Sequence, residues 1–396
     1  MRKFIPIKDR IEYGGAMIGQ EEVNAIMKVI TSQGGKRWTI GPESVALEKE
    51  LAQVAGVKRA ILTNSGSSAL LIGIASLNLP KNSKVIIPAV TFPTAFNSIV
   101  QNNLMPLVVD VDIKTLNLSF VQVEKAFKKY KNSISAVLAV DIAGNPVDLI
   151  ALRKITKAYG AKIILDDCDG FGTFLRGSLI ERYADVSVVS FHAAHIITMG
   201  EGGAVLTDNV SVADKASKFR EWGRASGSDK IYHYKELPKD YKERYVFEEI
   251  GYNLKPLELQ CAMGRIQLKK LALFREKRSK NYKKLEKIFN KYKEFFSIVS
   301  AIKNSTPCWF SFPFLCRKIS REKAMRVFEE NNIETRTIFA GNILKHPAYK
   351  NTNYIQFGNL NNANDVLENG MFISCHPSIN NDMISFIEKT VKGLIS

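Results

Sequence analysis

The sequence predicts an α/β protein with a large, mostly parallel sheet, followed by a smaller α+β domain. Strand-like apolar runs alternate with helical segments over roughly the first 250 residues, and this alternation is typical of a parallel sheet covered on both faces. The alternation ends near residue 254, where a long amphipathic segment begins. The 396-residue chain, of which 45% is hydrophobic, is long enough to bury a large core and form two domains.

The elements of the first domain follow from apolar spacing. Residues 1–19 are expected to be irregular because glycines mark turns at positions 14, 15 and 19. One helix begins near Glu21 and another follows Gly41 and Pro42, each with apolar residues at helical spacing. Strands are predicted at 59–63, 84–88, 107–111, 136–140, 162–165 and 186–190, with helices at about 67–78, 120–130 and 147–159. Ligands of such sheets bind at the carboxyl ends of the strands.

The second domain is expected to hang on one connecting helix. The predicted elements are a helix at 256–292, a strand at 307–315, a short helix near 321–331, a strand-like run at 371–375 and a closing helix. We therefore predict a large domain over residues 1–254, including an N-terminal segment, and a connecting helix with a small domain over residues 255–396.

The formal charge of +17 comes from 56 Lys and Arg residues against 39 Asp and Glu residues. One interpretation of this charge is that many lysines lie on solvated helix faces. A more specific interpretation is that the positive charge attracts an anionic substrate that carries a diphosphate. The lysines are spread out and form no compact basic arm, so nucleic acid is not expected as a partner. The five cysteines include no CxxC pair, and no apolar run reaches the length of a leader or membrane span. These features predict a soluble cytoplasmic protein with reduced thiols and no membrane partner.

Two polar clusters follow predicted strands. The turn Thr-Asn-Ser-Gly-Ser-Ser at 63–68 precedes an Ala- and Leu-rich helix. Its amides and hydroxyls form an anion site or simply an N-cap, and Gly66 allows close approach of the backbone. Asp166, Asp167 and Asp169 follow the apolar run at 163–165. A carboxylate there caps the loop or holds the protonated ring nitrogen of a pyridine cofactor.

Two further clusters are Ser190 with His195, and the segment Gly-Tyr-Asn-Leu-Lys at 251–255. No lysine occurs between Lys162 and Lys215 in this lysine-rich chain.

Together, the order and spacing of these clusters resemble the sugar aminotransferase family of the DegT/StrS type, which consists of fold-type I pyridoxal-phosphate proteins. The resemblance covers nearly the whole chain, from about Tyr13 onward. It implies a homodimer. The phosphate of the cofactor is expected to contact Gly66, Ser67 and Ser190, with Asn253 completing the phosphate site from the partner subunit. Phe92 is expected to stack on the pyridine ring and Asp166 to bind its nitrogen, with Asp169 as a further cofactor-binding residue. Leu165 stands where the family has a glutamate.

The family's cofactor-bound lysine, five residues after the serine of Ser190-Phe191, is His195 here. The segment SFHAAHIITMGEGG resembles the 3-dehydratase branch, as do the segments at 251–258, 307–312 and 340–342. That branch acts on nucleotide-linked 4-keto-6-deoxysugars, on the route to 3,6-dideoxysugars of surface polysaccharides such as lipopolysaccharide O-antigen. Imidazole forms no stable Schiff base, which favours a non-covalently held pyridoxamine phosphate. It remains a good base near neutral pH. The resemblance therefore implies that His195 removes a proton from the methylene group of the cofactor and that the C3 hydroxyl of the sugar then leaves.

One half of this branch carries a two-iron, two-sulfur cluster held by four cysteines. From Cys168, the cluster spacing lands on Ser226, Ser228 and Glu236, which supply no thiolate. We therefore expect no iron–sulfur cluster and no metal, with glutamate as the amino donor. A guanidinium suits the glutamate carboxylate, and our candidate is Arg336.

Two residues are assigned more loosely to the substrate pocket. Arg224 is a second candidate for binding the substrate, and His192, where the branch tends to carry tyrosine, is expected to line the pocket.

Two other functions stay open at this point. One is a nucleotide-sugar aminotransferase with an atypical base, which would bind its cofactor through a lysine. The other is a cofactor-binding regulator, suggested by the net charge and by fold analogy, although no helix-turn-helix lies outside the enzyme-like body. The nucleotide (GDP, CDP or dTDP), the stereochemistry of the sugar and the use of a reductase partner are not readable from the sequence.

Overall fold

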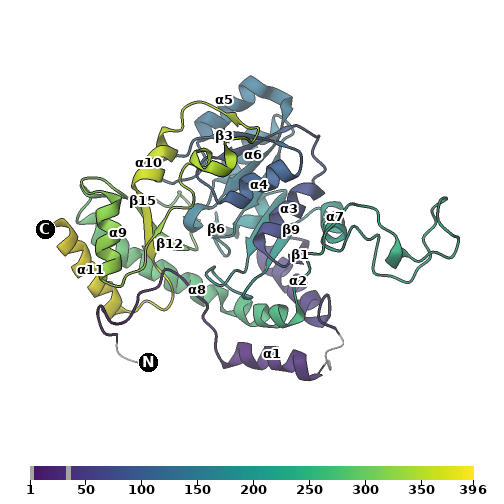
Figure 1. Ribbon diagram of the computed structural model, residues 1–396, viewed down its shortest axis with the longest axis horizontal. Coiled ribbons are helices and arrows are strands. Elements are labelled where there is room, and N and C mark those ends of the chain that lie inside the picture. The colour runs from purple at the N-terminus through teal and green to yellow at the C-terminus, as the bar shows by residue number, and fades with distance from the viewer. Residues whose placement is uncertain (1–3, 33–36) are drawn as a thin grey trace.

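The structure, a computed structural model, describes residues 4–32 and 37–396. Residues 1–3 of the predicted irregular N-terminal segment lie outside this range. The strands form one eight-stranded sheet in the order β1-β9-β8-β5-β4-β2-β3-β14, a four-stranded antiparallel sheet β10-β12-β15-β13, and a small sheet β11-β6-β7. In the large sheet only β9 runs antiparallel to its neighbours, so the predicted mostly parallel sheet is confirmed (Figure 1).

The strands and helices have these bounds. The strands are β1 (Arg59–Thr63), β2 (Lys84–Pro88), β3 (Met105–Val109), β4 (Ile134–Val140), β5 (Lys162–Asp166), β6 (Phe174–Leu175), β7 (Ser178–Leu179), β8 (Val186–Ser190), β9 (Gly203–Thr207), β10 (Phe296–Ile298), β11 (Ser305–Thr306), β12 (Ser311–Cys316), β13 (Arg336–Thr337), β14 (Ile355–Gln356) and β15 (Gly370–Ser374). The α-helices are α1 (Gln20–Ser32), α2 (Pro42–Ala55), α3 (Gly66–Ser76), α4 (Pro93–Gln101), α5 (Phe120–Tyr130), α6 (Leu149–Lys157), α7 (Val210–Arg220), α8 (Glu258–Asn290), α9 (Arg321–Glu330), α10 (Asn361–Asn369) and α11 (Asn381–Ile395).

The large sheet is buried on both faces because alternate residues of a strand point to opposite sides. In β4, Ala136, Leu138 and Val140 belong to the core that also holds α3 and α4. Val137 and Ala139 belong to a second core with α5 and α6. The two-sided burial explains why these strands are continuous apolar runs in the sequence.

Most predicted elements are present, with small shifts at their ends. Strand β3 ends two residues earlier than predicted because Asp110 stops it. Its carboxylate accepts hydrogen bonds from the backbone N–H groups of Val111, Asn362 and Ala363. Helices α4, α7 and α10 were not predicted. Helix α4 begins with Pro93 in its first turn. It was not predicted because its short sequence contains residues typical of strands and shows no clear helical spacing of apolar residues.

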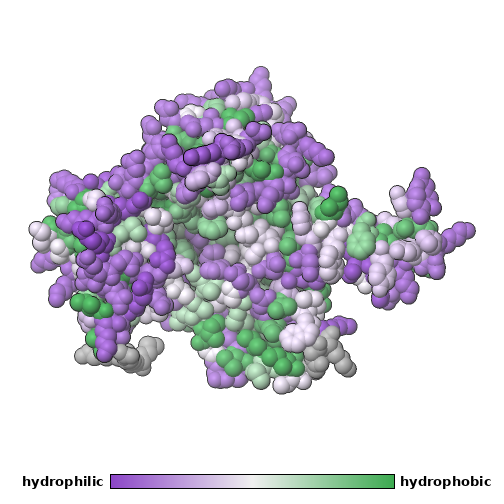
Figure 2. Space-filling model, viewed as in Figure 1, coloured by the Kyte–Doolittle hydropathy of each residue, from purple (hydrophilic) through white to green (hydrophobic). Residues whose placement is uncertain are grey.

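Helix α1 forms where predicted, but its apolar stripe is not buried in the chain. Val23, Met27 and Ile30 are exposed, whereas Glu22 and Val29 are buried. The Glu22 carboxylate faces α8, where it accepts hydrogen bonds from Gln267 Nε2 at 2.8 Å and Lys270 Nζ at 2.6 Å. Figure 2 shows the exposed stripe as a hydrophobic area at the bottom of the molecule, where α1 lies.

Helix α8 connects the large sheet to the four-stranded sheet. Two segments cross the predicted division at residue 254. Strand β14 pairs with β3 of the large sheet, and Ile11 of the N-terminal segment forms a bridge with Ile333. Residues 255–396 remain our proposed second domain. Its strand β14 extends the sheet of the first domain.

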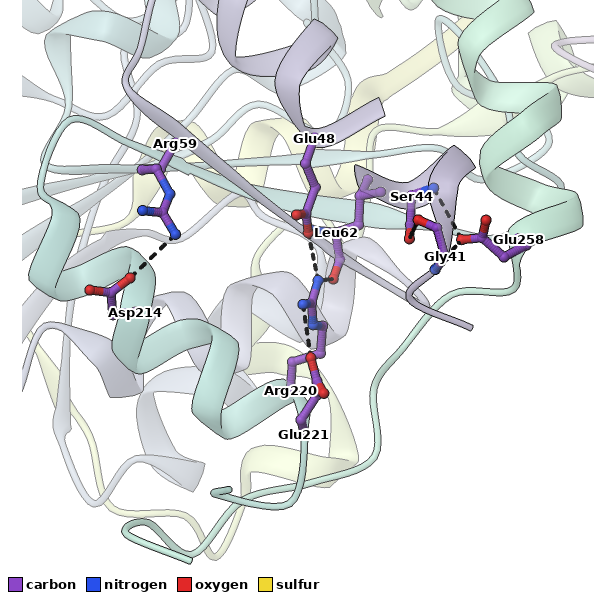
Figure 3. Close-up of polar contacts among 9 residues, drawn as sticks. All are labelled: Gly41, Ser44, Glu48, Arg59, Leu62, Asp214, Arg220, Glu221 and Glu258. Carbon is purple, nitrogen blue, oxygen red and sulfur yellow. Dashed lines mark hydrogen bonds and ion pairs between the residues drawn. The ribbon is translucent and has the colours of Figure 1, made fainter. Parts of the chain in front are cut away.

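The junction of α2 and α8 is held by a buried carboxylate. Glu258, the first residue of α8, accepts hydrogen bonds from the backbone N–H groups of Gly41 at 2.8 Å and Ser44 at 3.1 Å (Figure 3). It also accepts one from Glu43 N at 2.8 Å. These donors belong to the first turn of α2, whose N-terminus attracts negative charge. Glu258 thus caps a helix more than 200 residues away in sequence.

Residues 225–250, which we call the arm, project from the body between α7 and α8 (Figure 1). Tyr245, Phe247 and Ile250 of the arm are exposed. Over residues 4–32 and 37–396, no helix has both the length and the apolar composition needed to cross a membrane.

Candidate active site

A cavity of about 630 Å³ lies at the carboxyl ends of β1, β2, β4, β5 and β8, as expected for a parallel sheet. Nine of the eleven predicted site residues line it: Gly66, Ser67, Phe92, Asp166, Asp169, Ser190, His192, His195 and Arg336. The fold therefore brings together residues from five strand ends and from β13 of the small sheet.

The turn after β1 forms a cradle at the N-terminus of α3. Ser65 Oγ caps the helix by accepting from Ser68 N at 3.1 Å, and Ser67 Oγ bonds Thr94 Oγ1 at 3.1 Å. Gly66 is required by close packing, because a Cβ there would lie 2.7 Å from the Cβ of Ser190. The free N–H groups of this first turn face the cavity and suit a phosphate.

Asp166 ends β5 and is buried in the cavity wall. Its Oδ1 accepts a hydrogen bond from Cys168 N at 3.3 Å. Burial raises the pKa of Asp166, and hydrogen bonds from Cys168 oppose the rise. Among the described residues, no Lys, Arg or His side chain pairs with this carboxylate, so it can accept a cationic ligand. A protonated pyridine nitrogen fits it, as the phosphate fits the cradle.

His195 sits in the turn after β8, with its side chain 19% exposed. Its Nε2 lies 3.8 Å from Asp169 Oδ1, and its ring meets Phe310 edge-on with centroids 5.7 Å apart. Burial, with His192 and Arg278 nearby, lowers the pKa of His195 to about 3. The imidazole is therefore neutral at pH 7 and keeps one unprotonated ring nitrogen.

Asp169 has the opposite behaviour. Burial and the neighbouring Asp166 raise its pKa to about 8, against a hydrogen bond from Ala143 N and the charge of Arg278. Asp169 is thus mostly protonated at pH 7. The pair of a neutral histidine and a protonated carboxyl group places a proton acceptor beside a proton donor.

His192 and Arg336 border the mouth of the cavity. His192 Nε2 lies 3.8 Å from Glu201 Oε1, and its ring lies 5.4 Å from that of His195. The Arg336 guanidinium stacks 4.5 Å from the Tyr13 ring centroid and pairs with Glu334. Arg336 is half-exposed and can still offer donors to an anion.

Two predicted residues do not line the cavity of their own chain. Asn253 is exposed, and its Oδ1 accepts from Lys255 Nζ at 2.6 Å. Lys255 and Arg224 both lie over the Trp222 ring, at 3.4 and 5.0 Å from its centroid. This surface joins the base of the arm. Asn253 stays a prediction for the phosphate site of a partner subunit, and Arg224 stays a prediction for the substrate pocket.

The three positions that the cluster spacing reaches from Cys168 lie in the arm. The hydroxyls of Ser226 and Ser228 both donate to Glu243 Oε2 at 2.6 Å within the arm, whereas Cys168 lines the cavity. Glu236 pairs with Lys235 on the arm surface. In the described parts of the chain, no three His, Cys, Asp or Glu side chains are arranged to hold a metal ion. The absence of a cluster remains a prediction of the sequence.

The sequence missed several residues of the cavity. Thr94 is the second residue of α4, Phe310 precedes β12, and Phe339 and His346 lie in the loop after β13; all four line the cavity. Phe92 meets Phe339 edge-on with centroids 6.2 Å apart. The Thr-Phe-Pro-Thr turn could have indicated Thr94 as the start of a helix, but no local pattern predicts the others.

The model of the DegT/DnrJ/EryC1/StrS aminotransferase family matches residues 17–392. The chain belongs to this family. It is 32% identical over 94% of its length to the lipopolysaccharide biosynthesis protein RfbH of Salmonella typhimurium, of which 89% is covered. It is also 32% identical, over 90% of its length, to the GDP-4-keto-6-deoxy-D-mannose 3-dehydratase of Yersinia pseudotuberculosis, of which 92% is covered.

A solved structure of Escherichia coli GDP-4-keto-6-deoxy-D-mannose-3-dehydratase with bound hydrated PLP superposes with a TM-score of 0.86. The identity is 28%, over 96% of this chain and 100% of that chain. The expected fold type I of PLP-dependent enzymes is therefore confirmed for this member of the family.

Proposed function

We propose that this protein is a pyridoxamine-phosphate-dependent enzyme that removes the C3 hydroxyl of a nucleotide-linked 4-keto-6-deoxysugar. The product lies on the route to a 3,6-dideoxysugar of a surface polysaccharide, and glutamate restores the amine form of the cofactor. The observation that carries the proposal is His195, which lies in the cavity at the place of the family's lysine. Over the described residues, no lysine lines this cavity.

The residues of the cavity fit the cofactor. The first turn of α3, with Gly66 and Ser67, and the hydroxyl of Ser190 would hold the phosphate. Asp166 would hold the protonated ring nitrogen, Asp169 would lie beside the ring, and Phe92 would cover one face of it. When bound, the cofactor supplies an amine for the substrate ketone and a ring that withdraws electrons.

His195 is suited to proton transfer without covalent attachment. Burial keeps the ring neutral at pH 7, so the lone pair of Nε2 is open to the proton whose removal releases the C3 hydroxyl. The protonated imidazole can then return the proton to the departing C3 hydroxyl as water. Phe310 covers one edge of the ring, and the His195 side chain is only 19% exposed, which limits the access of bulk solvent.

Arg336 is our candidate for the carboxylate of the glutamate donor. It enters the cavity from the small sheet, across from the strand ends that carry the cofactor contacts. Glu334 and the Tyr13 ring hold its guanidinium in place, which lowers the entropic cost of binding a carboxylate. His192, beside Glu201, is a candidate contact for the sugar.

We further propose a cytoplasmic homodimer. The apolar stripe Val23, Met27 and Ile30 on α1 is exposed in the single chain, as expected of a surface that another copy covers. Asn253 and Arg224 at the base of the arm would complete the site of the partner, near its phosphates. All five cysteines are free, which fits a reducing compartment.

The proposal is tested by incubating the protein with pyridoxamine phosphate, glutamate and a panel of GDP-, CDP- and dTDP-linked 4-keto-6-deoxysugars. Mass spectrometry should detect a product that has lost the C3 oxygen, together with 2-oxoglutarate. A product that gains an amine and keeps its oxygen would instead identify an aminotransferase.

Borohydride reduction of the PLP-loaded protein provides an independent check. The proposal predicts that no peptide carries the reduced cofactor, because imidazole does not hold it covalently. A cofactor adduct mapped to any lysine would refute the assignment of His195.

A further inference from the structure

His195 lines a second, very small cavity in addition to the large one. The small cavity has room of about 10 Å³ for the centre of a water molecule, which is close to what one buried water needs. Gly15, Thr198, Gln267 and His376 line it together with His195. The N-terminal segment, the loop after β8, α8 and the end of β15 therefore meet at this point.

The two nitrogens of His195 have different surroundings. Nε2 lies 3.8 Å from Asp169 on the side of the large cavity. Nδ1 is buried and has no hydrogen-bond partner among residues 4–32 and 37–396. Because a buried polar atom without a partner costs free energy, Nδ1 calls for a ligand in the small cavity that His195 lines.

The hydrogens of the other polar side chains around the small cavity are already engaged. Gln267 Nε2 donates to Met17 O and to Glu22 Oε1. Thr198 Oγ1 donates to Phe191 O at 3.2 Å. Their oxygens also accept hydrogen bonds, Gln267 Oε1 from Thr198 N at 3.4 Å and Thr198 Oγ1 from Gly200 N at 2.9 Å, and each oxygen keeps a second lone pair.

The tautomer of His376 follows from its contacts. Its Nε2 faces a carbonyl oxygen, which can only accept, so Nε2 carries the hydrogen and Nδ1 accepts from Ser378 Oγ at 2.7 Å and Ser378 N at 3.2 Å. Its Nε2 then donates to Gly15 O at 3.0 Å. The Gly15 carbonyl keeps a second lone pair, and His376 has no hydrogen left for the cavity.

We propose that one buried water accepts a hydrogen bond from Nδ1–H of His195 and donates to Gly15 O and Gln267 Oε1. A water has two hydrogens to give to these acceptors and needs a donor for its lone pair. Among the side chains that line the small cavity within residues 4–32 and 37–396, His195 is the one that can supply it. The water thereby fixes His195 as the Nδ1–H tautomer and leaves the lone pair of Nε2 facing Asp169 and the large cavity. Gln267 and His376 are then positioning residues that act on the base through this water.

The role of Nε2 as a base rests on the proposed function, but the tautomer and the water do not. Nuclear magnetic resonance of cofactor-free protein labelled with ¹⁵N-histidine reads the tautomer of each of the five histidines. The His195→Asn variant identifies the His195 signals. At pH 7.5 we expect a protonated Nδ1 and an unprotonated Nε2, and the opposite tautomer would overturn the inference.

The water itself is tested by a high-resolution crystal structure of the unaltered protein. We expect one water within hydrogen-bond distance of His195 Nδ1, Gly15 O and Gln267 Oε1. An empty cavity, or a direct bond from Nδ1 to the Ser190 carbonyl, which also influences the titration of this histidine, would overturn it.

The Gln267→Met variant removes an acceptor of the water. We expect it to mix the two tautomers of His195 and to lower kcat roughly tenfold with KM nearly unchanged. Gln260→Met on the same helix is the matched control, because Gln260 bonds Glu201 O and Leu257 N at the surface. An unchanged tautomer in folded Gln267→Met would contradict the bridge; if the variant does not fold, the crystal structure decides.

The two hypotheses can fail separately. An Nδ1–H tautomer with a water but no deoxygenation of any sugar would refute only the proposed function. Deoxygenation by a protein with the opposite tautomer would refute only the water bridge.

Discussion

At the scale of single residues, the site depends on how burial changes proton affinity. The same burial that lowers the pKa of His195 to about 3 raises that of Asp169 to about 8. Both groups are therefore uncharged at pH 7, which is the cheaper state for groups out of water. A neutral imidazole is a base without prior loss of a proton, as the proposed reaction requires.

We predict that His195→Asn lowers deoxygenation by roughly 10²–10⁴-fold, the usual contribution of a general base. Cofactor affinity should change less than about threefold, because the phosphate and ring contacts lie elsewhere in the cavity. Turnover assays and equilibrium titration with pyridoxamine phosphate measure the two effects. His233→Asn, on the exposed surface of the arm, should match the unaltered protein. Full activity in His195→Asn would remove His195 from the mechanism.

Asp166→Asn should weaken cofactor binding by roughly 10- to 100-fold, since a hydrogen bond to a charged group contributes about 1.5–3 kcal/mol. The amide of the variant has no negative charge, so it does not stabilise the protonated pyridine ring of the cofactor as the carboxylate would. Titration followed by the cofactor's absorbance measures the affinity, with exposed Asp240→Asn as the control. Equal affinities of the two variants would show that Asp166 does not contact the ring nitrogen.

At the scale of elements, helix ends explain how distant segments are joined. Glu258 caps α2 from the first turn of α8. A similar function is carried by Arg220 at the end of α7, which donates to Glu48 Oε1 at 2.6 Å and to Leu62 O at 3.1 Å (Figure 3). Both side chains are buried, so their partners are satisfied without water.

Glu258→Gln should destabilise the protein by about 1–3 kcal/mol. The amide replaces one of the two acceptor oxygens with a donor that faces backbone N–H groups, and it loses the charge that the helix N-terminus favours. The melting temperature should fall by several degrees. Glu276→Gln on the same helix is the matched control, because Glu276 forms only an exposed pair with Lys280. Equal melting temperatures of the two variants would contradict the capping role.

At the scale of the whole molecule, one chain leaves apolar surface uncovered. The stripe on α1 and the aromatic residues of the arm are exposed, and Figure 2 shows hydrophobic areas on both. Burial of this surface by a second copy is the basis of the proposed homodimer.

Met27→Lys, in the middle of the stripe, should weaken the dimer because it places a charge in an apolar contact. Sedimentation velocity at micromolar concentration should show more monomer than in the unaltered protein. Cofactor affinity should fall with it if Asn253 acts across the interface. The neighbouring Lys28→Ala provides the control. An unchanged dimer would show that α1 lies outside the interface.

The stability of the whole protein should depend on pH through its buried histidines. Burial, with Arg278 nearby, lowers the pKa of His376 to about 3, below its value of about 6.5 in an unfolded chain. Between these values the unfolded state binds more protons, so acidification destabilises the fold. From pH 7 to pH 5 the loss for one such histidine is about 2 kcal/mol.

His376→Asn should therefore reduce the drop in unfolding free energy between pH 7 and pH 5 by about that amount, although it is less stable at pH 7. Urea denaturation at both pH values measures it. Buried Asp169 and Glu181 have pKa values raised to about 8 and about 7, so acidification stabilises the fold through them. This contribution is the same in both proteins and cancels when the variant is compared with the unaltered protein. A drop equal to that of the unaltered protein would show that the pKa of His376 is not lowered in the folded state.

The sequence by itself determined most of the local elements and indicated the residues of the candidate cofactor site. Continuous apolar runs predicted β1, β2, β4, β5 and β8 because strands of a two-sided sheet bury every residue. The polar turns that follow these strands indicated Gly66, Asp166, Ser190 and His195, since the carboxyl ends of parallel strands meet at one edge.

Only the tertiary structure decided which groups share an environment. It set the raised pKa of Asp169, brought Phe310, Phe339 and His346 to the cavity, and left the apolar stripe of α1 facing outward. It also placed Gln267 and His376 behind His195. Burial and proton affinity depend on neighbours that lie hundreds of residues away, and no local pattern in a single chain encodes them.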